Sequence, residues 1–272
     1  MPDLFITLGA WTIKTYTLAV ALGIVVSAGF GVYRLHTIAR PAHIIDVYLG
    51  GLVGGAILAR AIHVLLNWNY FAYNLSEITA VSTGGLDWHG AVFGALLGMV
   101  IVARWRRIDP ALAIDSLTPA LALITLTAWF GCWSASCAYG VEVPSLADYP
   151  AAMVWEGPDV FGIYAPRFDT QVIGMAFSIG LLVIAGLLIV LPFFRRSRFW
   201  IVLGLMSLGM FGIGFWRGDY ALYADGLRLD QWLDGVMIGV AIAVGWLQTV
   251  HRPKLSSCDH HPTLISDQDN RG

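Results

Sequence analysis

The chain alternates between long apolar stretches and short polar ones along most of its length. Seven stretches approach the roughly 20 residues that an α-helix needs to cross a bilayer. They are residues 16–33, 44–66, 89–103, 111–133, 171–194, 199–215 and 231–250. This pattern predicts an all-α membrane protein with about seven transmembrane helices in one domain, residues 1–250. A polar cytoplasmic tail, 251–272, should follow and is expected to be disordered.

Basic residues occupy every second connection between these stretches, which indicates the orientation in the membrane. They are Arg34, Arg40, Arg104, Arg106, Arg107, Arg195, Arg196, Arg198, Arg252 and Lys254. The other connections, 67–88 and 134–170, carry acids and aromatics instead. The N-terminus is therefore expected outside and the C-terminus in the cytoplasm. The proline-containing segment 134–170 is expected to form an irregular external cap loop.

Composition excludes a soluble protein, because 57% of the residues are hydrophobic and only 12% are charged. Soluble domains carry about 25% charged residues. The three cysteines form neither a disulfide framework nor a metal-ligand pattern. Cys132 and Cys137 lie five residues apart near the end of a predicted helix, which is unfavourable for a disulfide while that turn stays helical. Their pairing is left open. No cleavable signal peptide is expected.

The stretch 84–94, Gly-Gly-Leu-Asp-Trp-His-Gly-Ala-Val-Phe-Gly, runs from a polar loop into an apolar segment. His89 can titrate near neutral pH, and a polar group at membrane depth is a functional candidate. The alternative is an interfacial histidine beside an anchoring tryptophan, Trp88. Gly90, Gly94 and Gly98 recur every four residues, which favours close helix packing over a direct ligand role.

Three arginines on the predicted outward side can converge with His89 on one cavity. Arg60 lies inside an apolar stretch, Arg167 precedes the fifth stretch and Arg217 follows the sixth. Guanidinium groups suit the planar recognition of phosphate. Snorkelling to the interface is the alternative for Arg167 and Arg217. The set suggests a site for a lipid phosphate.

Several motifs occur in a fixed order. They are Ile-Lys-Thr-Tyr at 13–16, the Gly-x-x-x-Ala-Arg-like segment 55–60, the histidine–glycine stretch 84–90, residues 119–140, Arg-Phe-Asp-Thr-Gln at 167–171, Phe-Trp-Arg-Gly-Asp at 215–219 and Asp-Gln-Trp at 230–232. In number, order and placement they resemble the bacterial prolipoprotein diacylglyceryl transferases, and the resemblance covers nearly the whole chain.

The resemblance implies transfer of a diacylglyceryl group from phosphatidylglycerol to the lipobox cysteine of prolipoproteins, in the bacterial plasma membrane. The expected partners are phosphatidylglycerol, the prolipoprotein signal peptide and membrane lipid. No nucleic acid, cofactor or metal is expected. The reaction needs a thiolate and cations that stabilise the leaving phosphate. The residues implied as catalytic are His89 and Arg217. Those implied as substrate-binding are Tyr16, Arg60, Gly90, Arg167, Gln171, Asp219 and Gln231. An ordinary interfacial tyrosine is the alternative for Tyr16.

The chain departs from the family pattern at several positions. Trp129 and Met210 stand where the family has arginines, and Gly214 stands where it has a glutamate. The other departures are Thr125 for glutamine, Asp169 for proline and Gly174 for an acid. A second hypothesis therefore stays open: an inactive or re-purposed lipid- or protein-binding membrane protein on the same scaffold. A transporter or channel is a third, although the chain shows no internal repeat and no paired broken segments in corresponding halves.

Overall fold

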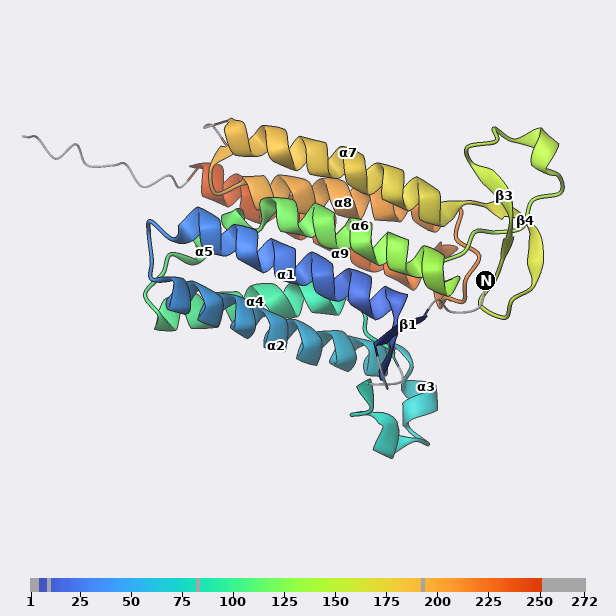
Figure 1. Ribbon diagram of the computed structural model, residues 1–272, viewed down its shortest axis with the longest axis horizontal. Coiled ribbons are helices and arrows are strands. Elements are labelled where there is room, and N and C mark those ends of the chain that lie inside the picture. The colour runs from blue at the N-terminus through green and yellow to red at the C-terminus, as the bar shows by residue number, and fades with distance from the viewer. Residues whose placement is uncertain (1–4, 9–10, 82–83, 192–193, 251–272) are drawn as a thin grey trace, which may run out of the picture.

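Long helices dominate the computed structural model, which describes residues 5–8, 11–81, 84–191 and 194–250 (Figure 1). The helices are α1 (Thr15–Leu35), α2 (Pro41–Leu66), α3 (Trp68–Phe71), α4 (Trp88–Trp105), α5 (Pro110–Ser116), α6 (Thr118–Ala135), α7 (Thr170–Val190), α8 (Arg198–Gly214) and α9 (Leu229–Val250). The strands are β1 (Phe5–Leu8), β2 (Trp11–Lys14), β3 (Val154–Pro158), β4 (Tyr164–Phe168), β5 (Tyr223–Ala224) and β6 (Leu227–Arg228). The predicted tail, 251–272, lies outside the described residues.

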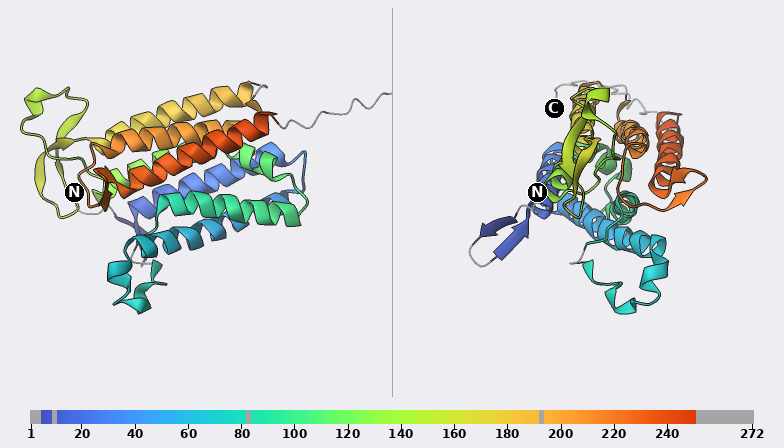
Figure 2. Two further views of the ribbon diagram at one scale, coloured as in Figure 1. Left: turned by 180° about the vertical axis from the view of Figure 1, so that it is seen from behind. Right: turned by 90° about the vertical axis from the view of Figure 1, so that its right-hand side faces the viewer.

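The long helices form one bundle with roughly aligned axes (Figures 1 and 2). The closest helix pairs are α2 with α4, α8 with α9, α1 with α6 and α6 with α7. The hairpins β1–β2 and β3–β4 lie at the same end of the bundle as α3 (Figure 1). We call this the hairpin end and the opposite one the basic end.

Six of the described helices are long and apolar enough to cross a bilayer, namely α1, α2, α4, α6, α7 and α9. Helix α8 is also apolar but has 17 residues. Many large apolar side chains point away from the bundle, among them Val25, Ile57 and Leu187. Such exposure is unfavourable in water and normal against lipid tails. The prediction of an all-α, multi-pass membrane protein is confirmed.

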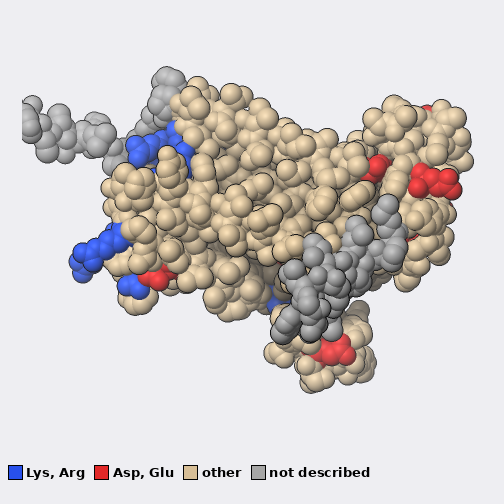
Figure 3. All heavy atoms as spheres, in the orientation of Figure 1, with Lys and Arg blue, Asp and Glu red and all other residues tan. Residues whose placement is uncertain are grey.

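The basic and acidic loops of the sequence lie at opposite ends of the bundle. Lys and Arg gather mostly at the basic end, whereas acidic side chains lie mostly toward the hairpin end (Figure 3). At the basic end Arg106 pairs with Asp46 at 2.7 Å, and Arg196 pairs with Asp109. The two ends of the bundle therefore differ as the alternating loops predict.

The fourth apolar stretch is not one helix, as the sequence suggested, but two. Helix α5 ends at Ser116 and α6 begins at Thr118, with Leu117 between them. Pro119 lies in the first turn of α6, where a backbone N–H would have no intrahelical carbonyl acceptor, so its absence costs no hydrogen bond. The proline therefore starts a new helix instead of continuing the previous one.

The cap segment between α6 and α7 is more regular than predicted. Strands β3 and β4 pair antiparallel, from Val154 opposite Phe168 to Pro158 opposite Tyr164. Asp159 Oδ1 accepts hydrogen bonds from the backbone N–H of Phe161 and Ile163, and so closes the turn. The expectation of an irregular loop was thus wrong for this half of the segment.

Glycines bring α2 and α4 into backbone contact. A Cβ on Gly94 would lie 2.2 Å from the Gly54 carbonyl oxygen, and one on Gly98 would lie 2.1 Å from that of Gly50. A Cβ on Gly90 would lie 2.6 Å from the Leu58 carbonyl oxygen. The repeated glycines therefore serve helix packing, and they hold the start of α4 against α2.

Candidate functional site

His89 lies in the first turn of α4, and the sequence before it explains why the helix begins there. Asp87 is the N-cap residue, and its Oδ1 accepts a hydrogen bond of 2.8 Å from the Gly90 N–H. Burial alone would raise the pKa of Asp87, but hydrogen bonds from the His89 side chain and the Gly90 N–H outweigh that effect and lower it. The Asp87 carboxylate is therefore ionised beside the imidazole.

The His89 side chain is 0% exposed and lies between two carboxylates. Its Nε2 is 3.3 Å from Oδ1 of Asp234 on α9, and its Nδ1 is 3.5 Å from Oδ2 of Asp87. Carboxylates only accept, so each nitrogen can donate to one of them when it carries a proton. Two such partners fix the ring plane and stabilise its protonated form, which suits a general base.

Two arginines and two aspartates form a network beside α9. Arg217 donates to both oxygens of Asp219, at 2.9 and 2.6 Å, and to Asp230 at 3.0 Å. Arg228 donates from Nε to Asp230 at 3.1 Å and from a terminal nitrogen to the Asp219 carbonyl oxygen at 3.0 Å. The Arg217 side chain is 23% exposed and that of Arg228 only 2%. Arg217 is thus the accessible cation of the pair.

The first turns of α9 join His89 to this network. Asp230 contacts Arg217, and Asp234, four residues later on the same helix face, contacts His89. Burial alone would lower the pKa of Arg217, but Asp219, Asp230 and Asp234 outweigh burial and raise it. Arg217 therefore carries its charge beside the first turns of α9, the helix that also contacts His89.

Gln231 supports the network, and both of its side-chain polar atoms have hydrogen-bond partners. Its Oε1 accepts from the Arg228 N–H at 3.0 Å, and its Nε2 donates to the Phe211 carbonyl at 2.9 Å. A Cβ on Gly214 would lie 2.8 Å from its side chain. Gln231 therefore occupies the space beside Gly214 and ties α9 to α8.

Arg60 has a different environment from the one the sequence suggested. It is buried in α2, and its guanidinium donates to five backbone carbonyls in the loop before α4. The acceptors are Glu77, Ile78, Ala80, Gly84 and Gly85. These contacts involve every nitrogen of the side chain. In this arrangement Arg60 anchors the loop that leads into His89.

Arg167 and Gln171 lie at the hairpin end, on β4 and in the first turn of α7. Arg167, on β4, is buried and contacts Glu142 at 2.9 Å and Asp159 at 3.4 Å. Its guanidinium lies over the Tyr139 ring. Gln171, in the first turn of α7, donates from Nε2 to the Cys137 carbonyl at 3.0 Å. Both side chains therefore hold the segment that follows α6.

That segment begins with a disulfide between Cys132 and Cys137. The helix ends at Ala135, and Ser136 adopts a left-handed conformation with φ 54°, which brings the two Cα atoms to 4.6 Å. The sequence-based objection to a disulfide assumed a continuous helix. Because the helix stops between the cysteines, the bond can form.

The residues after the disulfide connect Arg167 with Arg217. Gly140 pairs with Arg217 and Glu142 pairs with Arg167 in isolated β-bridges. The Gly218 N–H donates to the Tyr139 carbonyl at 2.8 Å. Tyr16, at the start of α1, is exposed and packs against Gly131, one residue before the disulfide. The predicted site residues therefore fall into two groups that Arg217 links. Tyr16, Arg167 and Gln171 lie along this segment, whereas His89, Asp219 and Gln231 lie at α9 or its arginine network. Arg60 and Gly90 instead serve the loop and helix contacts of α4.

The positions that depart from the family pattern are filled by packing or local hydrogen bonds. The Trp129 ring lies against Gly174 on α7, and Met210 packs against the core. Thr125 donates to the Leu121 carbonyl at 2.7 Å and contacts the Met206 sulfur at 3.1 Å. Trp129, Met210 and Gly174 therefore place no charge where the family pattern has one.

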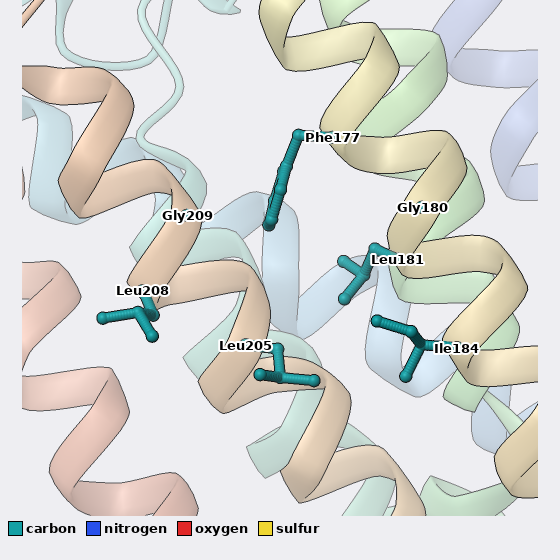
Figure 4. A pocket seen from close by; sticks show the side chains of 7 residues that line it. All are labelled: Phe177, Gly180, Leu181, Ile184, Leu205, Leu208 and Gly209. Atoms are coloured by element: carbon teal, nitrogen blue, oxygen red, sulfur yellow. The ribbon is translucent and has the colours of Figure 1, made fainter.

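An apolar groove of about 320 Å³ separates α7 from α8 (Figure 4). Phe177 extends across it toward Gly209, where a Cβ would lie 2.1 Å from the Phe177 ring. The other lining residues are Gly180, Leu181, Ile184, Leu205 and Leu208. The lining offers only dispersion contacts, so the groove suits a hydrocarbon chain.

Sequence reasoning missed Arg228, Asp230 and Asp234. Asp234 carried a usable signal, because a carboxylate within an apolar stretch is a functional candidate. The two Arg-x-Asp tripeptides, at 217–219 and 228–230, were another signal. Among the described residues, no group of three or more His, Cys, Asp or Glu side chains is arranged to hold a metal ion.

The chain is similar to known proteins over most of its length. The profile of the prolipoprotein diacylglyceryl transferase family matches residues 3–247. A protein of Clostridium novyi is 28% identical over 235 residues, covering 85% of this chain and 89% of its own. One of Acaryochloris marina is 25% identical and covers 92% of each chain. One of Paenarthrobacter aurescens is 27% identical and covers 98% of this chain and 87% of its own. All three are named phosphatidylglycerol–prolipoprotein diacylglyceryl transferase. The chain belongs to the prolipoprotein diacylglyceryl transferase family.

Proposed function

We propose that this protein transfers the diacylglyceryl group of phosphatidylglycerol to the lipobox cysteine of prolipoproteins. The observation that carries the proposal is the joint placement of His89 and Arg217 by the first turns of α9. A thiol transfer needs a base for the sulfur and a cation for the leaving phosphate, and these two side chains supply them.

His89 accepts the proton of the cysteine thiol in the proposed reaction. The thiolate attacks the glycerol carbon that bears the phosphate, so a sulfur–carbon bond forms while the carbon–oxygen bond breaks. The electron pair stays on the phosphate oxygen, and glycerol phosphate leaves. Arg217 stabilises that negative charge, since it is the more exposed arginine of its network.

The other predicted residues support the substrates in this proposal. Asp219 orients Arg217 through two hydrogen bonds. Gln171, Arg167 and Tyr16 line the segment between α6 and α7, where phosphatidylglycerol and the prolipoprotein signal peptide meet. The groove between α7 and α8 accommodates an acyl chain of the membrane lipid.

The hairpin end faces the outside of the bacterial plasma membrane in this proposal, because the arginine-rich loops lie at the opposite end. A reporter fused after Pro150 should then read as external, and one fused after Arg106 as cytoplasmic. A cytoplasmic signal at Pro150 would place the site on the wrong side for secreted prolipoproteins.

Transfer itself is tested with purified protein in phosphatidylglycerol vesicles and a synthetic lipobox peptide. The expected result is a peptide whose mass increases by one diacylglyceryl group. A peptide with its cysteine replaced by serine is the matched control. Rescue of lipoprotein maturation in cells depleted of their own transferase is the corresponding test in vivo.

A second candidate is a lipid- or protein-binding protein that performs no transfer. The contacts of Trp129, Met210 and Arg60 favour it, because none of these side chains offers a free charge to phosphate. Binding of phosphatidylglycerol without any mass gain of the peptide would support this candidate over the transferase.

A further inference from the structure

Two buried polar atoms on α6 and α7 have no hydrogen-bond partner among the described residues. They are the indole Nε1–H of Trp129, in a side chain that is 5% exposed, and Oε1 of Gln171, in one that is 2% exposed. Buried donors and acceptors are almost always paired, because burying one without a partner is unfavourable. A neighbouring unpaired donor and acceptor therefore indicate a ligand that supplies both partners.

Gly174 places the Trp129 and Gln171 side chains beside each other. A Cβ on Gly174 would lie 2.3 Å from Cε2 of Trp129, the atom bonded to Nε1. Gly174 follows Gln171 by three residues on α7, so both are on one face of that helix. The Trp129 ring and the Gln171 side chain are thus neighbours on this face of α7.

Both groups are held in place before any ligand arrives. A carbonyl oxygen can only accept, so the Gln171 atom that contacts the Cys137 carbonyl is Nε2, and Oε1 is left over. Cys137 is itself fixed by the disulfide to Cys132. The glycine contact holds the Trp129 ring. A fixed donor and a fixed acceptor reduce the entropy lost on binding.

The chemistry of the pair selects a neutral group. A phosphodiester offers only acceptors, whereas a hydroxyl both donates and accepts. We propose that Trp129 and Gln171 form a neutral subsite for a polyol hydroxyl, a group that a glycerol headgroup carries and an ethyl headgroup lacks. The inference rests on the proposed function and specifies which part of the lipid is recognised there.

The test compares two lipids with the same charge. Phosphatidylglycerol and phosphatidylethanol are both singly charged phosphodiesters, but only phosphatidylglycerol carries headgroup hydroxyls. Binding to the purified full chain is measured for each lipid by native mass spectrometry. The parent should prefer phosphatidylglycerol by about three- to tenfold, the effect of one or two hydrogen bonds.

Trp129→Phe keeps an aromatic ring on Gly174 and removes only the N–H. It should abolish most of the preference while its affinity for phosphatidylethanol stays unchanged. Trp200→Phe is the matched control, because Trp200 is also buried with an unpartnered Nε1 but lies in the first turn of α8, at the basic end. It should retain the parental preference.

A second pair of variants tests the acceptor if Trp129→Phe does not fold. Gln171→Met should lose the preference, whereas Thr170→Val, which removes the adjacent contact with the Ala138 carbonyl, should retain it. Equal affinity of the parent for the two lipids would overturn the subsite, and so would an unchanged preference for phosphatidylglycerol in Trp129→Phe. A bound water would then be the partner of the two polar atoms.

Excess free glycerol identifies the source of the hydroxyl. Selective displacement of phosphatidylglycerol by glycerol would assign the subsite to a soluble polyol as well, and no displacement would assign it to the lipid headgroup. The binding assay contains no peptide, so its result does not depend on transfer. If the parent prefers phosphatidylglycerol but does not transfer, the subsite stands and the proposed activity is rejected. If the parent transfers but Trp129→Phe keeps the preference for phosphatidylglycerol, the subsite is rejected and the proposed activity stands.

Discussion

Nε2 of His89 lies 3.3 Å from Oδ1 of Asp234, although 145 residues separate the two along the chain. The contact joins the first turn of α4 to the second turn of α9. It orients the imidazole and places it beside the helix that also carries the Arg217 partner Asp230. The positions of the proposed base, His89, and the proposed phosphate-binding cation, Arg217, thus both depend on α9. Changes in this helix should affect both side chains.

His89→Gln should leave insertion and expression near the parental level, because glutamine keeps a hydrogen-bonding side chain of similar reach. Transfer to a lipobox peptide should fall by about 10² to 10⁴, since glutamine cannot accept the thiol proton at neutral pH. Near-parental transfer by this variant would exclude His89 as the base.

Asp234→Asn should reduce transfer by between about tenfold and 10⁴-fold, because an amide can present its N–H to the imidazole and reorient it. Asp234→Glu should recover part of that loss, as the carboxylate remains. Asp225→Asn is the control, since Asp225 is exposed in the β5–β6 turn. An unaffected rate in Asp234→Asn would show that the 3.3 Å contact does not orient His89.

Arg217→Lys tests whether this arginine binds phosphate or only anchors the chain at the interface. Lysine keeps the charge but cannot reproduce the forked contacts with Asp219 and a second anion. Transfer should drop severely, by about tenfold or more, and phosphatidylglycerol affinity should fall with it. Arg40→Lys, at the exposed basic end, should change neither. If Arg217→Lys had the activity of the parent, phosphate binding by Arg217 would be excluded and anchoring at the interface would remain as its role.

Arg60→Lys should loosen the loop before α4, because an ammonium has three donors and cannot serve five carbonyls. We expect a loss of about 1–3 kcal/mol in the free energy of unfolding. Amide hydrogen exchange should rise in that loop before it rises in α9. Unchanged exchange combined with weaker lipid binding would instead favour a phosphate contact for Arg60.

Asp87→Asn isolates the charge of the N-cap residue, because asparagine also accepts a hydrogen bond from the Gly90 N–H. The folded-state pKa of Asp87 lies below the unfolded value of about 3.9. Its carboxylate therefore stabilises the fold above that pH, and the stabilisation disappears as the pH falls through the folded-state pKa. The parent should melt higher than the variant at pH 7, and the difference should shrink below about pH 4. A constant difference across this range would contradict the charge effect.

Sequence alone determined most of the long helices, the membrane class and the difference in charge between the two ends. Long apolar stretches and the placement of arginines are local properties, and a bilayer acts on them without reference to tertiary contacts. The repeated glycines likewise predicted the close packing of α4, because a missing side chain permits backbone approach in any partner geometry. The unusual positions of His89 and Arg217 in the pattern also mark them as candidates, and their catalytic roles stay predictions.

Tertiary structure decided what each polar side chain contacts. The pattern marks Arg60 as a buried cation but cannot distinguish a phosphate partner from five carbonyls of a loop about 20 residues away. It could not pair Cys132 with Cys137, because the bond depends on where α6 ends. Nor could it join Asp234 to His89, since that contact requires α9 to pack beside α4. Hydrogen bonds and ion pairs act over a few ångströms, so their partners are set only when the helices are assembled.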